Sequence, residues 1–148
     1  MGLDMYLYVK KYTSKYQDVE KNDRVWSLFP EIERIDNLDT AEVYFEYGYW
    51  RKANHIHNWF VENCQEGVDE CQRTNISRED LRKLLKICKE VNKHKEKAED
   101  LLPCAEGFFF GDDDYDEYYF GDVENTIKVI EKCLRLPEDW EFEYHSSW

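Results

Sequence analysis

Apolar and polar residues alternate near both ends of this 148-residue chain. The apolar positions near the start are Leu3, Met5, Leu7 and Val9. Those near the end are Trp140, Phe142 and Tyr144, which alternate with Glu141, Glu143 and His145. A period of two is typical of a strand with one buried face, so both stretches are predicted to be strands. Residues 41–48, AEVYFEYG, are rich in β-forming residues and predict another strand.

Three other segments repeat their apolar residues at helical spacing. The first helix is expected over residues 51–64. The second follows Ser77, a suitable N-cap with Asp80 three residues later, and buries a stripe that begins at Leu81. The third starts near Glu117 or Asp122 and ends before Pro137.

The remaining segments complete a single-domain pattern. Residues 13–40 are mostly polar and predict loops with one short helix, and the Phe108–Phe110 run predicts a short buried strand. No internal repeat or linker divides the chain. Residues 1–148 are therefore expected to form one α+β domain, with a small, mainly antiparallel sheet and about three helices packed on it.

Charge is distributed unevenly along the chain. Residues 1–95 carry 16 Lys/Arg against 17 Asp/Glu, whereas residues 96–148 carry 4 against 16. The second part, with a net charge of -12, disfavours direct binding to duplex nucleic acid because it repels phosphates. It is either a solvated acidic surface or a surface that meets a basic partner.

The cysteines and the apolar runs bear on the cellular compartment of the protein. The five cysteines are an odd number, are widely spaced and include no CxxC pair, which predicts reduced thiols. The N-terminal stretch MGLDMYLYVKKY lacks the apolar core of a signal peptide, and no apolar run is long enough to span a bilayer. A cytoplasmic protein without a membrane partner is expected.

The most concentrated set of functional side chains is YWRKANHIHNWF, residues 49–60. Its two histidines, His55 and His57, suggest a metal site, but side chains two residues apart on a helix diverge by about 200°. No zinc-binding spacing is present either, so we expect neither a metal nor a cofactor. On a helical wheel Lys52, His55 and Trp59 share one edge, with Arg51 and Asn54 on the next face.

Those side chains suit a nucleotide-like ligand. Arginine is suited to bidentate phosphate recognition, and a Trp face stacks on a base. The proposed binding residues are Trp50, Arg51, Lys52, Asn54, His55 and Trp59, together with Tyr115 and Tyr119. The alternative is an ordinary helix with Trp59 in the core and a solvated polar face.

Other chemistries have weaker signals. Asp112, Asp114 and Asp116 match the first ligands of an EF-hand loop, but Glu117 and Val123 stand where Gly and a bidentate Glu are needed. Phosphate loops and nucleophile motifs are missing. A histidine of the HxH pair with a carboxylate could act as an acid or base, although the sequence favours binding over catalysis.

Three blocks carry a family resemblance: MGLDMYLYVKKY, YWRKANHIHNWFVENCQEGVDECQ, and GFFFGDDDYDEYYFGDVENTIKVIEKCL with the ending DWEFEYHSSW. Through them the chain resembles a family of small phage and prophage proteins. The resemblance implies a phage accessory protein that acts in the bacterial host cytoplasm. It implies no particular reaction, cofactor or catalytic residue.

Three hypotheses follow. The first is an anti-defence binding protein that sequesters a nucleotide-like small molecule. The second is an inhibitor of a host defence protein, in which residues 96–148 mimic nucleic acid on a basic surface. The third is a small enzyme that uses His55 or His57. The terminal Trp148 either folds back onto the domain or anchors a partner, and a homo-oligomer is compatible with the sequence.

Overall fold

The computed structural model describes residues 2–35, 38–105 and 114–148. Four antiparallel strands form one sheet in the order β2-β1-β4-β3. The strands are β1 (Asp4–Ser14), β2 (Thr40–Arg51), β3 (Thr74–Ile76) and β4 (Glu141–Ser147). The helices in the described residues are α1 (Val19–Ser27), α2 (Asn54–Cys64), α3 (Arg78–Lys93), η1 (Lys95–Lys97), α4 (Ala98–Leu101) and α5 (Glu117–Leu134).

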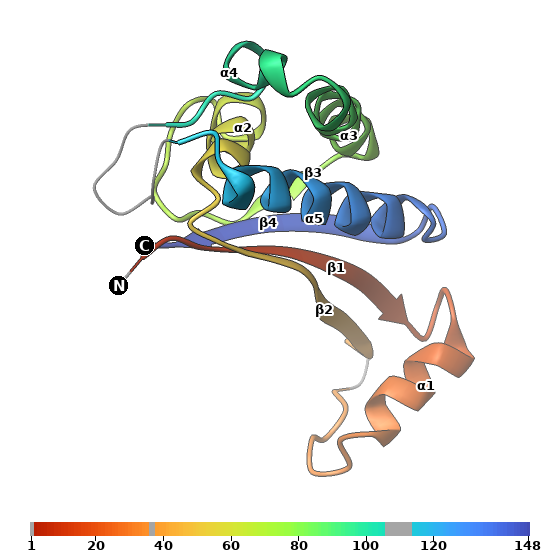
Figure 1. The fold of residues 1–148 in the computed structure, drawn as a ribbon. Helices are drawn as coiled ribbons and strands as arrows, with labels where there is room; N and C mark the ends of the chain where they lie inside the picture. Colours follow the sequence, from red (N-terminus) through yellow and green to blue (C-terminus); the bar gives the residue numbers. More distant parts are fainter. Residues whose placement is uncertain (1, 36–37, 106–113) are drawn as a thin grey trace.

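The α+β prediction is confirmed. Figure 1 shows α2, α3 and α5 on one face of the sheet, which matches the three expected helices. The described chain holds five α-helices in all, because α1 and α4 are short additional helices. The predicted strand at Phe108–Phe110 lies outside the described residues.

The core lies between the sheet and these helices. The apolar face of β1 is buried as its alternation predicts, and Phe142 and Tyr144 of β4 lie beside it. Ser77 caps α3 by accepting a hydrogen bond from the Asp80 amide (3.0 Å), and its hydroxyl donates to the Asp80 carboxylate (2.7 Å). The apolar stripe of α3 is fully buried and consists of Leu81, Leu84, Cys88 and Val91.

The boundary between β2 and α2 differs from the prediction. β2 continues through Arg51, and α2 begins only at Asn54. Lys52 has a φ of 58°, a left-handed conformation that ends the strand and turns the chain into the helix. The sequence predicted a helix from residue 51. In the structure Arg51 is the last residue of β2 and Lys52 lies in the turn, so neither is on a helical face.

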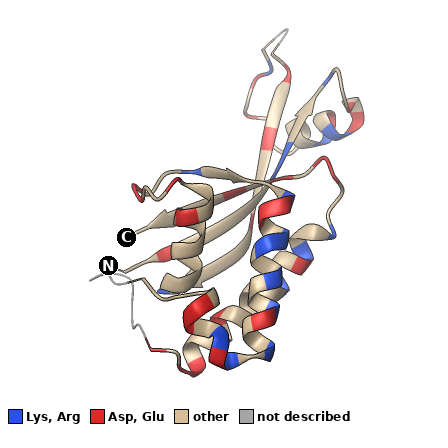
Figure 2. Cartoon of the chain, turned by 90° about the horizontal axis from the view of Figure 1, so that it is seen from above, with Lys and Arg blue, Asp and Glu red and all other residues tan. Residues whose placement is uncertain are grey.

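One part of the sheet extends beyond the helices. Figures 1 and 2 show the far ends of β1 and β2 projecting away from α5, with α1 packed beside them. Buried Asn22 ties α1 to β1 and to the residue that precedes β2: it accepts from Thr13 Oγ1 (3.0 Å) and donates to the Asp39 carbonyl (3.2 Å). These contacts give the projection a defined geometry.

Replacing Gly48 with alanine should destabilise the protein. A Cβ at this buried position of β2 would lie 2.6 Å from Val129 Cγ1 and 3.0 Å from the Trp50 ring. We expect a loss of about 1–3 kcal/mol in urea unfolding, as for other overpacked cores. Gly121→Ala, at an exposed position of α5, is the matched control, since a Cβ there meets nothing within 4 Å. It should stabilise the helix by about 0.5–1 kcal/mol, and equal effects of the two changes would contradict the packing.

None of the helices in the described residues is long and apolar enough to cross a membrane.

Candidate functional site

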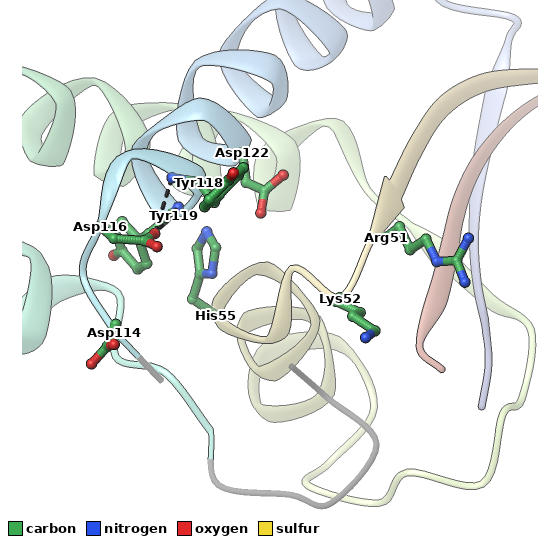
Figure 3. A pocket seen from close by; sticks show the side chains of 8 residues that line it. All are labelled: Arg51, Lys52, His55, Asp114, Asp116, Tyr118, Tyr119 and Asp122. Carbon is green, nitrogen blue, oxygen red and sulfur yellow. Dashed lines mark hydrogen bonds between the residues drawn. The ribbon is translucent and has the colours of Figure 1, made fainter. Parts of the chain in front are cut away.

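A cavity of about 410 Å³ opens between the turn that joins β2 to α2 and the first turns of α5. Figure 3 shows the side chains around it. The lining residues are Arg51, Lys52, His55, Asp114, Asp116, Tyr118, Tyr119 and Asp122. Cations thus come from the β2–α2 side, and carboxylates and rings from the α5 side.

His55 forms the buried wall of this cavity. It lies in the first turn of α2, is 3% exposed, and stacks on the Tyr119 ring with 4.0 Å between centroids. Its buried Nε2 has no hydrogen-bond partner among the described residues. Burial lowers the pKa of His55 to about 3, although the Tyr119 backbone acts in the opposite direction. At neutral pH the ring is therefore uncharged, with one nitrogen donor and one acceptor.

The first turns of α5 position the carboxylates. Asp116 is the N-cap, and its Oδ1 accepts from the amides of Tyr118 (2.9 Å) and Tyr119 (3.0 Å). The Tyr119 hydroxyl donates to the Leu102 carbonyl (2.7 Å), which fixes the ring under His55. Partial burial, with Asp116 nearby, raises the pKa of Asp122 to about 6. Asp122 therefore exchanges a proton close to neutral pH.

The cationic side of the cavity is formed by Arg51 and Lys52. Both are exposed, and neither forms an ion pair within the described part of the chain. Arg51 points away from His55 in Figure 3, whereas Lys52 lies closer to the ring. α2 begins close to Lys52 in sequence. Its N-cap is Ala53, whose methyl side chain cannot accept a hydrogen bond from the first amides of the helix. Such a helix start favours anions.

Half of the predicted ligand-binding set lines this cavity: Arg51, Lys52, His55 and Tyr119. Trp50 is instead a core residue, 2% exposed, whose Nε1 donates to Thr126 Oγ1 (2.8 Å). Trp59 is also buried in the core. Tyr115 packs against the core, where its hydroxyl accepts from the Cys104 amide (3.2 Å).

The position of Asn54 differs from the one that the helical wheel predicts. It was expected to face outward, but it is buried, and its Oδ1 accepts from the Ala105 amide (3.2 Å). The solvated polar face that was the alternative interpretation is wrong for His55 as well, because the chain after α4 and the start of α5 cover this side of α2. Only the tertiary packing could reveal that cover.

The two histidines diverge, as the helical spacing predicts. His57 is buried on the sheet side, where its Nε2 donates to Asp69 Oδ2 (2.8 Å) and its Nδ1 lies 2.7 Å from the Tyr144 hydroxyl. Trp148 Nε1 donates to the other Asp69 oxygen (3.2 Å), so the terminal residue folds back onto the domain while 44% exposed. This chain of contacts joins α2, the loop before β3 and the C-terminus.

Neither histidine has the geometry expected of an acid–base catalyst. In the described residues, His57 has a carboxylate partner but does not line the cavity, and His55 lines the cavity without a carboxylate partner. No group of three or more His, Cys, Asp or Glu side chains in the described residues is arranged to hold a metal ion. The EF-hand match cannot be followed through, since Asp112 and Asp113 lie outside those residues.

Tyr118 and Asp122 line the cavity although no sequence pattern predicted them as ligand-binding residues. They are four residues apart and so share one face of α5, next to the N-cap Asp116. An aspartate before a helix is a readable cap signal, but its position opposite His55 comes from the packing of α5 on α2.

No family model, curated protein or solved structure matches the chain. The function proposed below is therefore argued from the geometry of the cavity.

Proposed function

We propose that this protein is a non-enzymatic binding protein that sequesters a small nucleotide-like molecule in the cavity between α2 and α5. The observation that carries the proposal is the side chain of His55, which lines the cavity and whose buried Nε2 has no hydrogen-bond partner in the described chain. A buried polar atom left unpaired costs about 1–3 kcal/mol, and a ligand that pairs with it recovers that energy.

The remaining groups define the ligand. Lys52 and the uncapped start of α2 suit a phosphate, since both attract negative charge. Asp122 and neutral His55 suit the mixed N–H donors and acceptors of a base edge, and Tyr118 offers an exposed ring for stacking. The volume of about 410 Å³ falls in the range of small-ligand sites.

The resemblance to phage and prophage proteins supplies the setting of the proposal. A phage accessory protein that withdraws a nucleotide-like signal from the host cytoplasm would blunt a defence that depends on that signal. The link between setting and activity rests on analogy.

The nucleic-acid mimic is less favoured by the distribution of charge. Four carboxylates from residues 96–148 pair with cations from the first part of the chain: Glu131 with Lys89, Glu138 with Arg78, Asp139 with Lys11, and Glu143 with Arg73 and Lys10. Figure 2 likewise shows Asp and Glu interspersed with Lys and Arg over the helices. A mimic of a phosphate backbone needs rows of unpaired carboxylates instead.

Calorimetric titration with nucleotides tests the proposal. The probes are the 5′-mono- and diphosphates of adenosine, guanosine, cytidine and uridine. At least one should bind with a Kd of about 100 µM or tighter, and Lys52→Ala and His55→Gln should each weaken it by about tenfold. Lys83→Ala, a change at an exposed position of α3 that does not line the cavity, is the matched control and should have no effect. If none of these nucleotides binds at millimolar concentration, the proposal is wrong.

A further inference from the structure

The exposed apolar residues gather in one part of the molecule. We define the N-terminal arm as residues 12–35 and 38–46, which form the far ends of β1 and β2, α1 and the described parts of the connection between α1 and β2. Of the fifteen large hydrophobic side chains that are exposed in the described residues, ten belong to this arm. They include Leu28, Phe29, Ile32, Ile35 and Phe45, the last 55% exposed. Scattered exposed apolar residues are normal, but a concentration of them marks an interaction surface.

The arm has a fixed shape. Figures 1 and 2 show it projecting from the helix-covered part of the sheet. Buried Asn22 ties α1 to β1 and to the residue before β2, and Arg34 stacks over the Trp26 ring at 5.5 Å while pairing with Asp23 (2.7 Å). A preorganised surface loses little entropy on binding. β2 is also the outermost strand of the described sheet, and edge strands can pair with the main chain of a partner.

The charges of the arm identify its partner. Each cation already has a contact within the arm: Lys21 pairs with Asp18, Arg24 with Glu20, and Arg34 with Asp23 and Asp39, while Lys15 lies over the Tyr16 ring. The carboxylates of Glu31, Glu33, Glu42 and Glu46 are exposed and form no ion pair with any described residue. Glu31 and Glu33 alternate with apolar residues in the stretch LFPEIERI.

We infer that the N-terminal arm docks on another protein, through an apolar surface bordered by Lys or Arg side chains. Apolar contact would cover residues such as Phe29 and Ile32, and cations at the rim would meet the four carboxylates that form no ion pair in the described chain. A second copy of this chain fits poorly, because its arm presents the same unpaired carboxylates and its net charge is -13. The inference is independent of the proposed nucleotide site, which lies at the other end of β2.

Nuclear magnetic resonance titration with defined peptides tests this inference. The labelled 148-residue chain is titrated with the amphipathic peptide acetyl-KFKVKFK-amide and, in parallel, with acetyl-EFEVEFE-amide. The cationic peptide should shift resonances of the arm, and the acidic peptide should not. The double variant Glu31→Lys/Glu33→Lys should weaken binding by about tenfold, whereas the control Glu62→Lys/Glu124→Lys, at exposed helix positions outside the arm, should not.

Light scattering after size-exclusion chromatography tests the other possible partner of the arm, a second copy of this chain. The protein should run at its monomer mass of 18.1 kDa, and thermal melting should be unchanged in both charge variants. A dimer that is lost in Phe45→Lys would show that a second copy covers the arm and would overturn the inference. Equal binding of the two peptides, or shifts confined to other parts of the chain, would also overturn it.

Discussion

Lowering the pH from 7 to 4.5 should reduce the free energy of unfolding by about 3 kcal/mol through His55 alone. The pKa of this buried ring falls from 6.5 to about 3 in the folded chain. Between these values the unfolded chain binds a proton that the folded chain does not, so stability falls as the pH falls. Urea unfolding followed by Trp fluorescence at several pH values measures the change.

The variant His55→Phe isolates this contribution. A phenyl ring keeps the stack on Tyr119, found at 4.0 Å in the wild-type protein, but has no nitrogen to protonate. The variant should lose most of the pH dependence between 6.5 and 4.5. A wild-type slope that persists in His55→Phe would show that another group titrates.

Asp122 acts in the opposite direction in the same window. Its pKa is raised to about 6 by burial and by Asp116, so the folded chain binds the proton more tightly than the unfolded chain. Its contribution is present at low pH and is lost as the pH rises through 6. Asp122→Asn should therefore steepen the acid destabilisation due to His55, and measuring both variants separates the two groups.

Trp50→Ala should destabilise the protein by about 4 kcal/mol, the range for deleting a large aromatic from a packed core. The Trp50 ring is almost fully buried beside Val129 and Gly48, and its Nε1 donates to Thr126 Oγ1 (2.8 Å). Urea unfolding at pH 7 measures the loss. If Trp50 were a surface stacking group, as the sequence alone suggested, the change would be close to neutral.

Two controls make the Trp50 result specific. Trp148→Ala removes a ring of the same type that is 44% exposed, and it should cost about 1 kcal/mol. Thr126→Val keeps the volume but leaves the buried indole N–H without its acceptor, which should cost about 1–3 kcal/mol. Equal losses in Trp50→Ala and Trp148→Ala would contradict the core position of Trp50.

Local patterns predicted most of the fold because each element carries its own signal. The alternation from Leu3 to Val9 requires a strand with one buried face, and the Ser77–Asp80 cap followed by the Leu81 stripe requires a helix. These signals depend only on neighbours in sequence. Three-residue β3 was missed because it is too short for a periodic pattern and exists through its pairing with β4.

Of the eight residues that the sequence suggested for ligand binding, four line the cavity between α2 and α5 and four do not. The sequence determined that residues 49–60 concentrate cations, rings and imidazoles, and that His55 and His57 diverge. Tertiary structure alone decided that Lys52 adopts a left-handed turn, since no local signal separates that turn from a helix start. This shift of the helix start to Asn54 separates Arg51 and Lys52 from the helical face.

Long-range packing decided the rest. α5 and the chain after α4 close over α2, which buries Asn54 and His55 and brings Asp122 to the opposite wall. Helical and strand periodicities report which side of an element is apolar, because they depend on residue spacing. They cannot report which distant element covers a polar side, and in this protein that cover turns a polar helix face into a cavity.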